Sequence, residues 1–188
     1  MTKWKKRSKF LKLFHKAYDA VLFIGYCRFS KTRFLRHKGV RIGEKCTIIT
    51  KIQNFGTEPY LVKLGDNVTI THGVIFITHD GGTRLFRDEF PEMNPYGNVF
   101  GTIELGNNVF VGINSLLLPG SKISDNTLVG AGTIVKGNFE PGVVIAGNPG
   151  RVICGIDDYI TKVRSQMVHL QSTNRRDLRI ELEKHFNL

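Results

Sequence analysis

The chain has 188 residues, 41% of them apolar, which suffices for one folded domain and leaves no run of about 20 apolar residues to span a bilayer. The net charge of +11 lies at one end, because residues 1–41 carry 13 Lys and Arg against one acid and the remainder carries 14 basic and 15 acidic residues. The body is therefore nearly neutral. Since no RNA- or DNA-binding motif with aromatic platforms accompanies the basic end, we expect no nucleic-acid partner.

Residues 1–40 are predicted to be a basic, amphipathic helical leader. Phe10, Phe14 and Val21 belong to an apolar stripe at helical spacing, with lysines on the other faces. This helix could pack on the domain, or it could lie on an anionic membrane surface. A signal peptide is not expected, because the apolar stretch from Ala20 to Tyr26 is short and lacks a small-residue cleavage site.

The three cysteines, Cys27, Cys46 and Cys154, are odd in number, widely spaced and without the spacing of a metal site. This usage favours a reducing compartment over a disulfide framework, so we expect a cytoplasmic protein, either free or at the inner face of the membrane.

A six-residue repeat dominates the middle of the chain. Its aliphatic positions are Leu105, Val111, Leu117, Ile123, Val129 and Val135. A helix would space them by three and four and a flat strand by two, whereas a strict six suits short strands that turn a corner after each block. We therefore predict an all-β solenoid over residues 41–156, with three blocks to each triangular turn. Leu64, Ile70 and Phe76 form an earlier triplet, and Ile42 and Ile48 an irregular first pair.

The register breaks once in this run. Phe76 and Leu105 are 29 residues apart, which is not a multiple of six, so a segment of about residues 80–101 must leave the coil and return. Its Gly, Pro and charged residues suit an excursion loop. Long loops inside a domain are usually functional, although a surface decoration is the alternative.

Residues 157–188 are predicted to form a C-terminal helical segment. Tyr159, Ile160, Val163 and Met167 recur at helical spacing among charges. We expect this segment to cover the last coil, as terminal caps do in solenoids.

Three further motifs indicate a family. They are Phe110-Val111-Gly112, the block from Val129 to Val135, and the closing Ala146-Gly147-Asn148-Pro149-Gly150-Arg151. With the hexapeptide blocks they resemble the left-handed β-helix acyltransferases, and within them the bacterial polysaccharide and sugar O-acetyltransferases related to maltose and galactoside acetyltransferase. The resemblance covers about residues 40–158. It implies a left-handed parallel β-helix, a homotrimer and acetyl-CoA as acyl donor.

The resemblance also implies which residues bind the cofactor. They are Ile113, Ala131, Lys136, Gly137 and Arg151. Cationic Lys136 and Arg151 suit the phosphates of CoA. The scaffold alone could explain two of these residues. A corner needs a small residue such as Ala131, and Arg151 could cap backbone carbonyls. Relatives often carry Thr-Lys at positions 136–137 and a second basic residue at position 154.

The candidate catalytic residue is His79. Acyl transfer to a hydroxyl needs a general base with a pKa near 7, which suits histidine, and His79 stands where the regular blocks stop. Relatives use a histidine in this region, and the stretch from Thr78 to Gly82 resembles theirs. His72 is the rival, and Asp80 or Glu104 could orient the imidazole. We expect direct transfer without an acyl-enzyme.

Three functions remain open from the sequence. The first is transfer of acetyl from acetyl-CoA to a sugar hydroxyl in capsule, O-antigen or exopolysaccharide biosynthesis. The second is the same chemistry on a sugar amine, a drug hydroxyl or serine. The third is a non-catalytic scaffold or a carbonic-anhydrase-like metal protein, which the scattered histidines disfavour, so no metal is expected.

Overall fold

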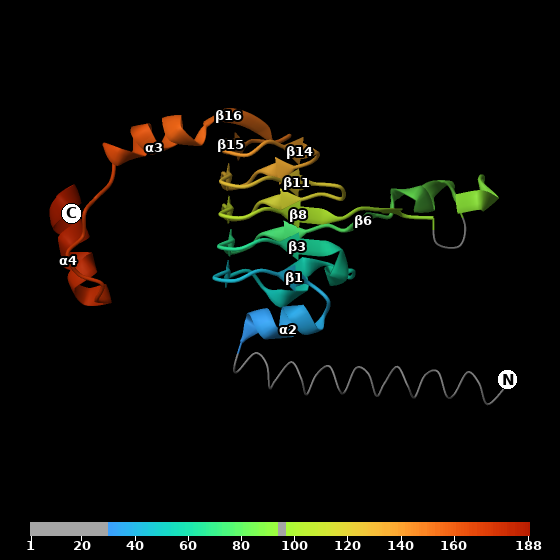
Figure 1. Ribbon diagram of the computed structural model, residues 1–188, viewed down its shortest axis with the longest axis horizontal. Helices are drawn as coiled ribbons and strands as arrows, with labels where there is room; N and C mark the ends of the chain where they lie inside the picture. Colours follow the sequence, from blue (N-terminus) through green and yellow to red (C-terminus); the bar gives the residue numbers. More distant parts are fainter. Residues whose placement is uncertain (1–29, 94–96) are drawn as a thin grey trace. The chain divides into compact units, whose positions relative to one another are not determined.

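The structure, a computed structural model, describes residues 30–93 and 97–188. Most of the predicted leader, residues 1–29, lies outside the described residues. Short strands stack into a parallel β-helix, as the repeat predicts (Figure 1). In chain order the elements are α2 (Lys31–His37), β1 (Arg41–Ile42), β2 (Thr47–Ile48), η1 (Ile52–Phe55), η2 (Pro59–Leu61), β3 (Val62–Leu64), β4 (Thr69–Ile70), β5 (Ile75–Phe76), β6 (His79–Asp80), η3 (Gly82–Phe86), η4 (Pro91–Met93), β7 (Val99–Phe100), β8 (Ile103–Leu105), β9 (Phe110–Val111), β10 (Leu116–Leu117), β11 (Lys122–Ile123), β12 (Leu128–Val129), β13 (Ile134–Val135), β14 (Asn138–Phe139), β15 (Val143–Ala146), β16 (Arg151–Gly155), α3 (Ile156–Arg164) and α4 (Arg175–Phe186).

Three sheets form the walls of the coil. Sheet A has the order β1-β3-β8-β11-β14, sheet B the order β16-β15-β12-β9-β4-β2, and sheet C the order β13-β10-β5. All pairs in these sheets are parallel except β15 with β16. Each strand is only two to five residues long because the chain turns a corner after every hexapeptide.

Strand register measures the length of each coil. Leu116 pairs with Ile134, so a regular coil contains 18 residues, or three hexapeptides. Ile75 pairs with Leu116, a separation of 41, so the excursion adds 23 residues to its coil. Thr47 pairs with Thr69, a separation of 22, which places a second insertion of four residues in the first coil.

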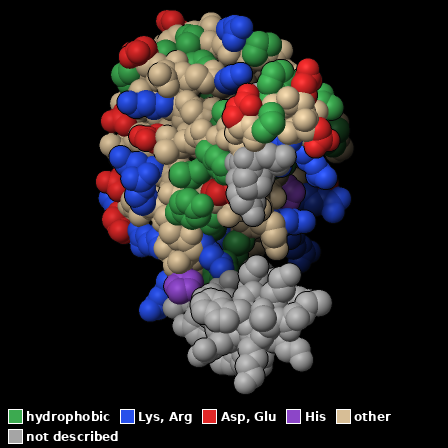
Figure 2. Space-filling model, turned by 90° about the vertical axis from the view of Figure 1, so that its right-hand side faces the viewer, with side chains coloured by type: hydrophobic (Ala, Val, Ile, Leu, Met, Phe, Trp, Pro, Cys, Tyr) green, Lys and Arg blue, Asp and Glu red, His purple; other side chains and the backbone are tan. Residues whose placement is uncertain are grey.

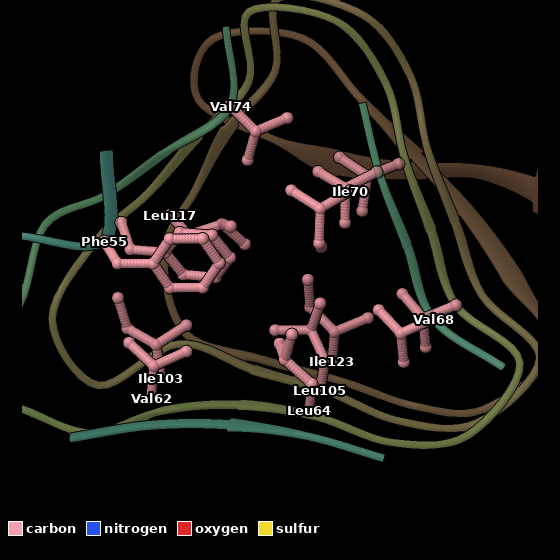
Figure 3. Close-up of a cluster of buried hydrophobic side chains, with 14 of the residues drawn as sticks. Phe55, Val62, Leu64, Val68, Ile70, Val74, Ile103, Leu105, Leu117 and Ile123 are labelled. Carbon is pink, nitrogen blue, oxygen red and sulfur yellow. The ribbon is translucent and has the colours of Figure 1, made fainter. Parts of the chain in front are cut away.

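The inward positions form one continuous core. All six anchors of the main repeat and all three of the upstream triplet are at most 2% exposed. Figure 3 shows side chains from the three walls meeting inside the triangle. In the first coil the inserted segment supplies Phe55, 1% exposed, as the inward residue. Hydrophobic burial along this axis is therefore the main stabilising term of the coil.

Asparagines mark one corner of successive coils. Asn67, Asn108 and Asn126 all have a left-handed backbone, with φ near +55°, which asparagine tolerates better than most residues. Asn67 Nδ2 donates to Asn108 Oδ1 (2.6 Å), and Asn108 Nδ2 donates to Asn126 Oδ1 (2.8 Å). This ladder aligns each coil with the next.

Helix α2 closes the N-terminal end of the coil. Phe34 and Leu35 are buried, and Lys31 Nζ donates to the carbonyls of Ile48, Ile49 and Thr50 at 2.9–3.0 Å. Arg36 donates to the carbonyl of Ile42 (2.8 Å). Among the described residues no strand precedes the first coil, and these cations satisfy carbonyls at that edge.

The excursion is a hairpin. Strands β6 and β7 pair antiparallel at its stem, with His79 opposite Phe100, and Figure 1 shows β6 leading away from the stacked coils. The hairpin exposes large apolar side chains, which are Leu85, Phe86, Phe90, Val99 and Phe100. In Figure 2 the side of the molecule from which the hairpin leaves shows hydrophobic groups among charged ones.

Residues 157–188 form a separate compact unit that contains most of α3 and all of α4. Asn174 caps α4 by accepting a hydrogen bond from the amide of Arg176 (2.9 Å). No helix in the described part of the chain is long and apolar enough to cross a membrane.

Candidate active site

His79 stands at the point where sheet C ends and the hairpin begins. It follows Thr78, which is 2% exposed, and its own side chain is 35% exposed. Phe100 lies beside it across the hairpin stem, with ring centroids 5.5 Å apart. Gly101 then rejoins the coil with its amide bonded to the carbonyl of Thr78 (3.0 Å). The hairpin stem therefore fixes the position of the imidazole.

Glu58 is the partner of this histidine. Its Oε2 lies 2.9 Å from His79 Nδ1 and also accepts the hydroxyl of Thr78 (2.7 Å). Its Oε1 accepts the hydroxyl of Thr57 (2.7 Å). The Glu58 side chain is 16% exposed, so the carboxylate is largely shielded and fully hydrogen-bonded.

These donors decide the charge of the carboxyl group. Burial raises the pKa of Glu58, but hydrogen bonds from Thr78, Thr57 and His79, with the charge of His79, together hold that pKa below its ordinary value near 4.5. Glu58 is therefore ionised at neutral pH.

Two hollows meet at His79. The Lys136 hollow, of about 370 Å³, is lined by Ile77, His79, Asp80, Gly81, Val99, Leu118, Pro119 and Lys136. The Gln53 hollow, of about 540 Å³, is lined by Gln53, Gly56, Thr57, Phe76, Ile77, Thr78 and His79. His79 and Ile77 belong to both. His79 therefore lies at the border between the two hollows.

Neither carboxylate named from the sequence contacts the imidazole. Asp80 accepts from the amide of Gly82 (2.8 Å) at the start of the hairpin. Glu104 lies on the outer face of sheet A and lines a third hollow that shares no residue with the other two. Glu58 is not among the residues predicted from the sequence, although Ile48 and Leu64 are separated by 16 positions, which breaks the six-residue period just as the larger excursion does.

Lys136 and Gly137 follow strand β13 at the same corner as His79. The register Ile75–Leu116–Ile134 continues to Ile77, Leu118 and Lys136, so these residues form a column across sheet C. Lys136 is exposed and shares a hollow with His79. A cation thus stands two coils from the imidazole.

Ile113 and Ala131 lie at the opposite corner, before the strands of sheet C. The amide of Gly132 donates to the carbonyl of Ile113 (2.7 Å), which stacks these positions on adjacent coils. Ile113 is 50% exposed. His72 is exposed at the same corner, where its carbonyl accepts from Asn114 (3.1 Å). His72 lines neither hollow beside His79.

Arg151 begins strand β16 and is exposed. Its Nη1 bonds the carbonyl of Gly150 (3.1 Å), and Gly150 in turn pairs with the carbonyl of Ile134 (2.9 Å). Arg151 therefore stands at the start of the last strand of sheet B, directly after a residue that bonds to sheet C. Within residues 30–93 and 97–188, no three His, Cys, Asp or Glu side chains group to hold a metal ion.

Known proteins share this sequence pattern. Protein CapG of Staphylococcus aureus is 40% identical over 153 residues, which are 81% of this chain and 87% of CapG. Galactoside O-acetyltransferase of Escherichia coli K12 is 36% identical over 102 residues, 54% of this chain and 47% of that protein. The chain belongs to the hexapeptide-repeat acetyltransferases.

The fold of this acetyltransferase agrees with solved relatives. A maltose O-acetyltransferase from Clostridium difficile 630 superposes with a TM-score of 0.53 at 21% identity, covering 78% of this chain and 88% of the other. The predicted left-handed β-helix is thereby confirmed. No family model matches the sequence.

Proposed function

We propose that this acetyltransferase moves an acetyl group from acetyl-CoA to a hydroxyl of a sugar, with His79 as general base, in the synthesis of a capsule, O-antigen or exopolysaccharide. The names of its relatives support the reaction class. The observation that carries the proposal is the His79–Glu58 pair, 2.9 Å apart, at the junction of two hollows. A base that faces two hollows suits a reaction between two bound substrates.

The two hollows differ in ways that assign a substrate to each. The Lys136 hollow combines a cation with Leu118 and Pro119, which suits a phosphate-bearing donor with an apolar arm. The Gln53 hollow offers the amide of Gln53 and the hydroxyl of Thr57, which suit a sugar rich in hydroxyls. We therefore assign acetyl-CoA to the first and the acceptor to the second.

The reaction then needs one base and no acyl-enzyme. His79 Nε2 takes the proton of the acceptor hydroxyl while that oxygen attacks the thioester carbonyl. The imidazolium returns the proton to the departing thiolate. Lys136 and Arg151 would hold phosphates of the donor, because a cation pairs with phosphate oxygens wherever they lie within reach.

A complete site is proposed to need more than one chain. Ile113 and Ala131 lie at the corner before sheet C, whereas Lys136 lies at the corner after it, about 16 Å along the chain from Ala131 at strand rise. We propose that one copy supplies Lys136 and a neighbouring copy supplies Ile113 and Ala131 to the same donor molecule. A homotrimer with a site at each interface satisfies this requirement and covers the exposed apolar residues of the hairpin.

We further propose that the reaction occurs in the cytoplasm, and that the basic leader holds the enzyme at an anionic membrane surface. The net charge of +12 over residues 1–41, against a nearly neutral remainder, supports this placement.

The proposal is tested by release of CoA thiol from acetyl-CoA in the presence of free sugars, nucleotide sugars and oligosaccharides, with His79→Ala as the control. We expect acceptor-dependent thiol release by the wild type and release slower by about 10²-fold or more by His79→Ala. Release with amines, chloramphenicol or serine but no sugar would support the other acceptor classes, and no release with any acceptor would support a scaffold.

A further inference from the structure

Glu58 does not exchange a proton with either substrate in the proposed reaction, yet its carboxylate accepts three hydrogen bonds beside the proposed base. It comes from the four-residue insertion in the first coil and not from the hexapeptide repeat. Its three donors are the hydroxyls of Thr57 and Thr78 and the Nδ1 of His79. The insertion therefore brings to His79 a carboxylate that the regular repeat does not supply.

The local backbone holds Glu58 firmly. Phe55, three residues before it, is buried in the core and stacks on Phe76. Gly56 between them has φ +73°, and a Cβ there would lie 3.1 Å from both the Phe76 carbonyl and the Thr78 hydroxyl. Only glycine therefore lets the inserted segment approach the strand that leads to His79.

The ionised carboxylate determines which nitrogen of the imidazole carries the proton. An ionised carboxylate only accepts hydrogen bonds, so His79 Nδ1 must donate to it. In the neutral ring Nε2 is then the unprotonated nitrogen with a free lone pair. We propose that Glu58 is a positioning residue that holds His79 in the Nδ1–H tautomer, so that Nε2 is the base; its kinetic consequence rests on the proposed acetyl transfer.

The carboxylate acts again when the proton moves. Once Nε2 has taken the acceptor's proton, the imidazolium carries a positive charge 2.9 Å from an anion that is already in place. Glu58 stays ionised throughout, and the proton passes from Nε2 to the leaving thiolate. Thr57 and Thr78 occupy lone pairs of the carboxylate, which keeps its orientation constant during the cycle.

The first test does not depend on activity. Nitrogen NMR of the full-length protein, labelled at histidine and assigned by comparison with His79→Gln, distinguishes Nδ1–H from Nε2–H in the neutral ring. We expect Nδ1–H for His79. An Nε2–H tautomer in the wild type would overturn the inference, whether or not the protein acetylates sugars.

The second test is kinetic. The equivalent carboxylate-to-amide change in serine proteases costs about 10⁴ in turnover through the wrong tautomer, and we expect a loss of about 10² for Glu58→Gln because His79 is partly exposed. The KM for acetyl-CoA should stay within about twofold, because Glu58 acts through His79. Glu58→Asp keeps the charge and should recover part of the loss.

The matched control is Glu104→Gln, the same exchange on the outer face of sheet A, which should leave turnover unchanged. The acid limb of the pH profile should move in Glu58→Gln but not in the control. Glu58 is the charged group bonded to the imidazole, and Asp80 and Lys136 are the charged residues of the adjoining hollow. Turnover of Glu58→Gln within about threefold of wild type would overturn the positioning role and leave the acetyl transfer standing. If Glu58→Gln does not fold, the kinetic comparison uses Glu58→Asp, whose turnover should fall below wild type with an unchanged KM.

Discussion

Phe55 stacks on Phe76 with ring centroids 4.5 Å apart and planes 16° from parallel. The first ring belongs to the insertion that carries Glu58, and the second belongs to the strand that leads to His79. Glu58 and His79 are thus both attached to one aromatic contact in the core.

Removing this contact should cost stability. Phe55→Ala leaves a cavity in a fully buried position, so the free energy of unfolding should fall by about 3–5 kcal/mol in urea titrations. Phe186→Ala, on the exposed face of α4, should change it by no more than about 0.5 kcal/mol. Equal effects of the two substitutions would contradict the role of Phe55 as a core residue.

Loss of the proposed base should reduce turnover. His79→Ala should lower kcat by about 10²-fold or more, with the KM for acetyl-CoA little changed, because the imidazole acts on the acceptor's proton. Steady-state thiol release measures both quantities. If His79→Ala retains turnover while His72→Ala is inactive, the base is His72 and the geometry at His79 has another purpose.

Acid should remove a stabilising contribution of Glu58. Its pKa in the folded protein lies below the ordinary value near 4.5, so the contribution is fully present above that value and is lost as the pH falls through the folded pKa. The difference in unfolding free energy between the wild type and Glu58→Gln should therefore be constant above about pH 6 and shrink in more acidic urea titrations. If the stability difference between the wild type and Glu58→Gln grew on acidification, the lowered pKa of Glu58 would be contradicted.

Assembly should depend on the aliphatic outer row of sheet C. Leu116 lies between Ile75 and Ile134 on this face, whereas sheet A presents Lys63, Glu104 and Lys122. Light scattering should give about three times the 21.2 kDa of one chain. Leu116→Glu should lower that mass and the activity together, while Lys122→Glu should alter neither. An active wild-type monomer at assay concentration would contradict the shared site.

The leader should affect membrane binding without affecting chemistry. Deletion of Met1–Arg7 removes four Lys or Arg residues, each worth about 1 kcal/mol near an anionic surface. Sedimentation with phosphatidylserine vesicles at low salt should show weaker binding, and turnover on a soluble acceptor should be unchanged. Absence of vesicle binding by the full-length chain would favour the helix that packs on the domain.

The six-residue period predicts the coil because each inward position is repeated and each corner is local. Leu105 and Val135 occupy the core as their spacing predicts, and the hairpin begins close to the expected residue 80. The role of Glu58 could not be predicted in this way. Its contact with His79 joins residues 21 apart through a short insertion whose path depends on Phe55 and Gly56, and no period encodes that path.

The register of sheet C also sets a distance. Ile77, Leu118 and Lys136 lie in one column. The backbones of Ile77, two residues before His79, and of Lys136 are therefore separated by two strand spacings, about 9.5 Å. Side-chain substitution hardly alters this separation, because hydrogen bonds between coils maintain it. Only the gain or loss of a whole 18-residue coil changes it, by about 4.8 Å each time. The separation between the proposed base His79 and Lys136 is therefore set by whole coils, so a donor of a different length has to fit by changing its own conformation.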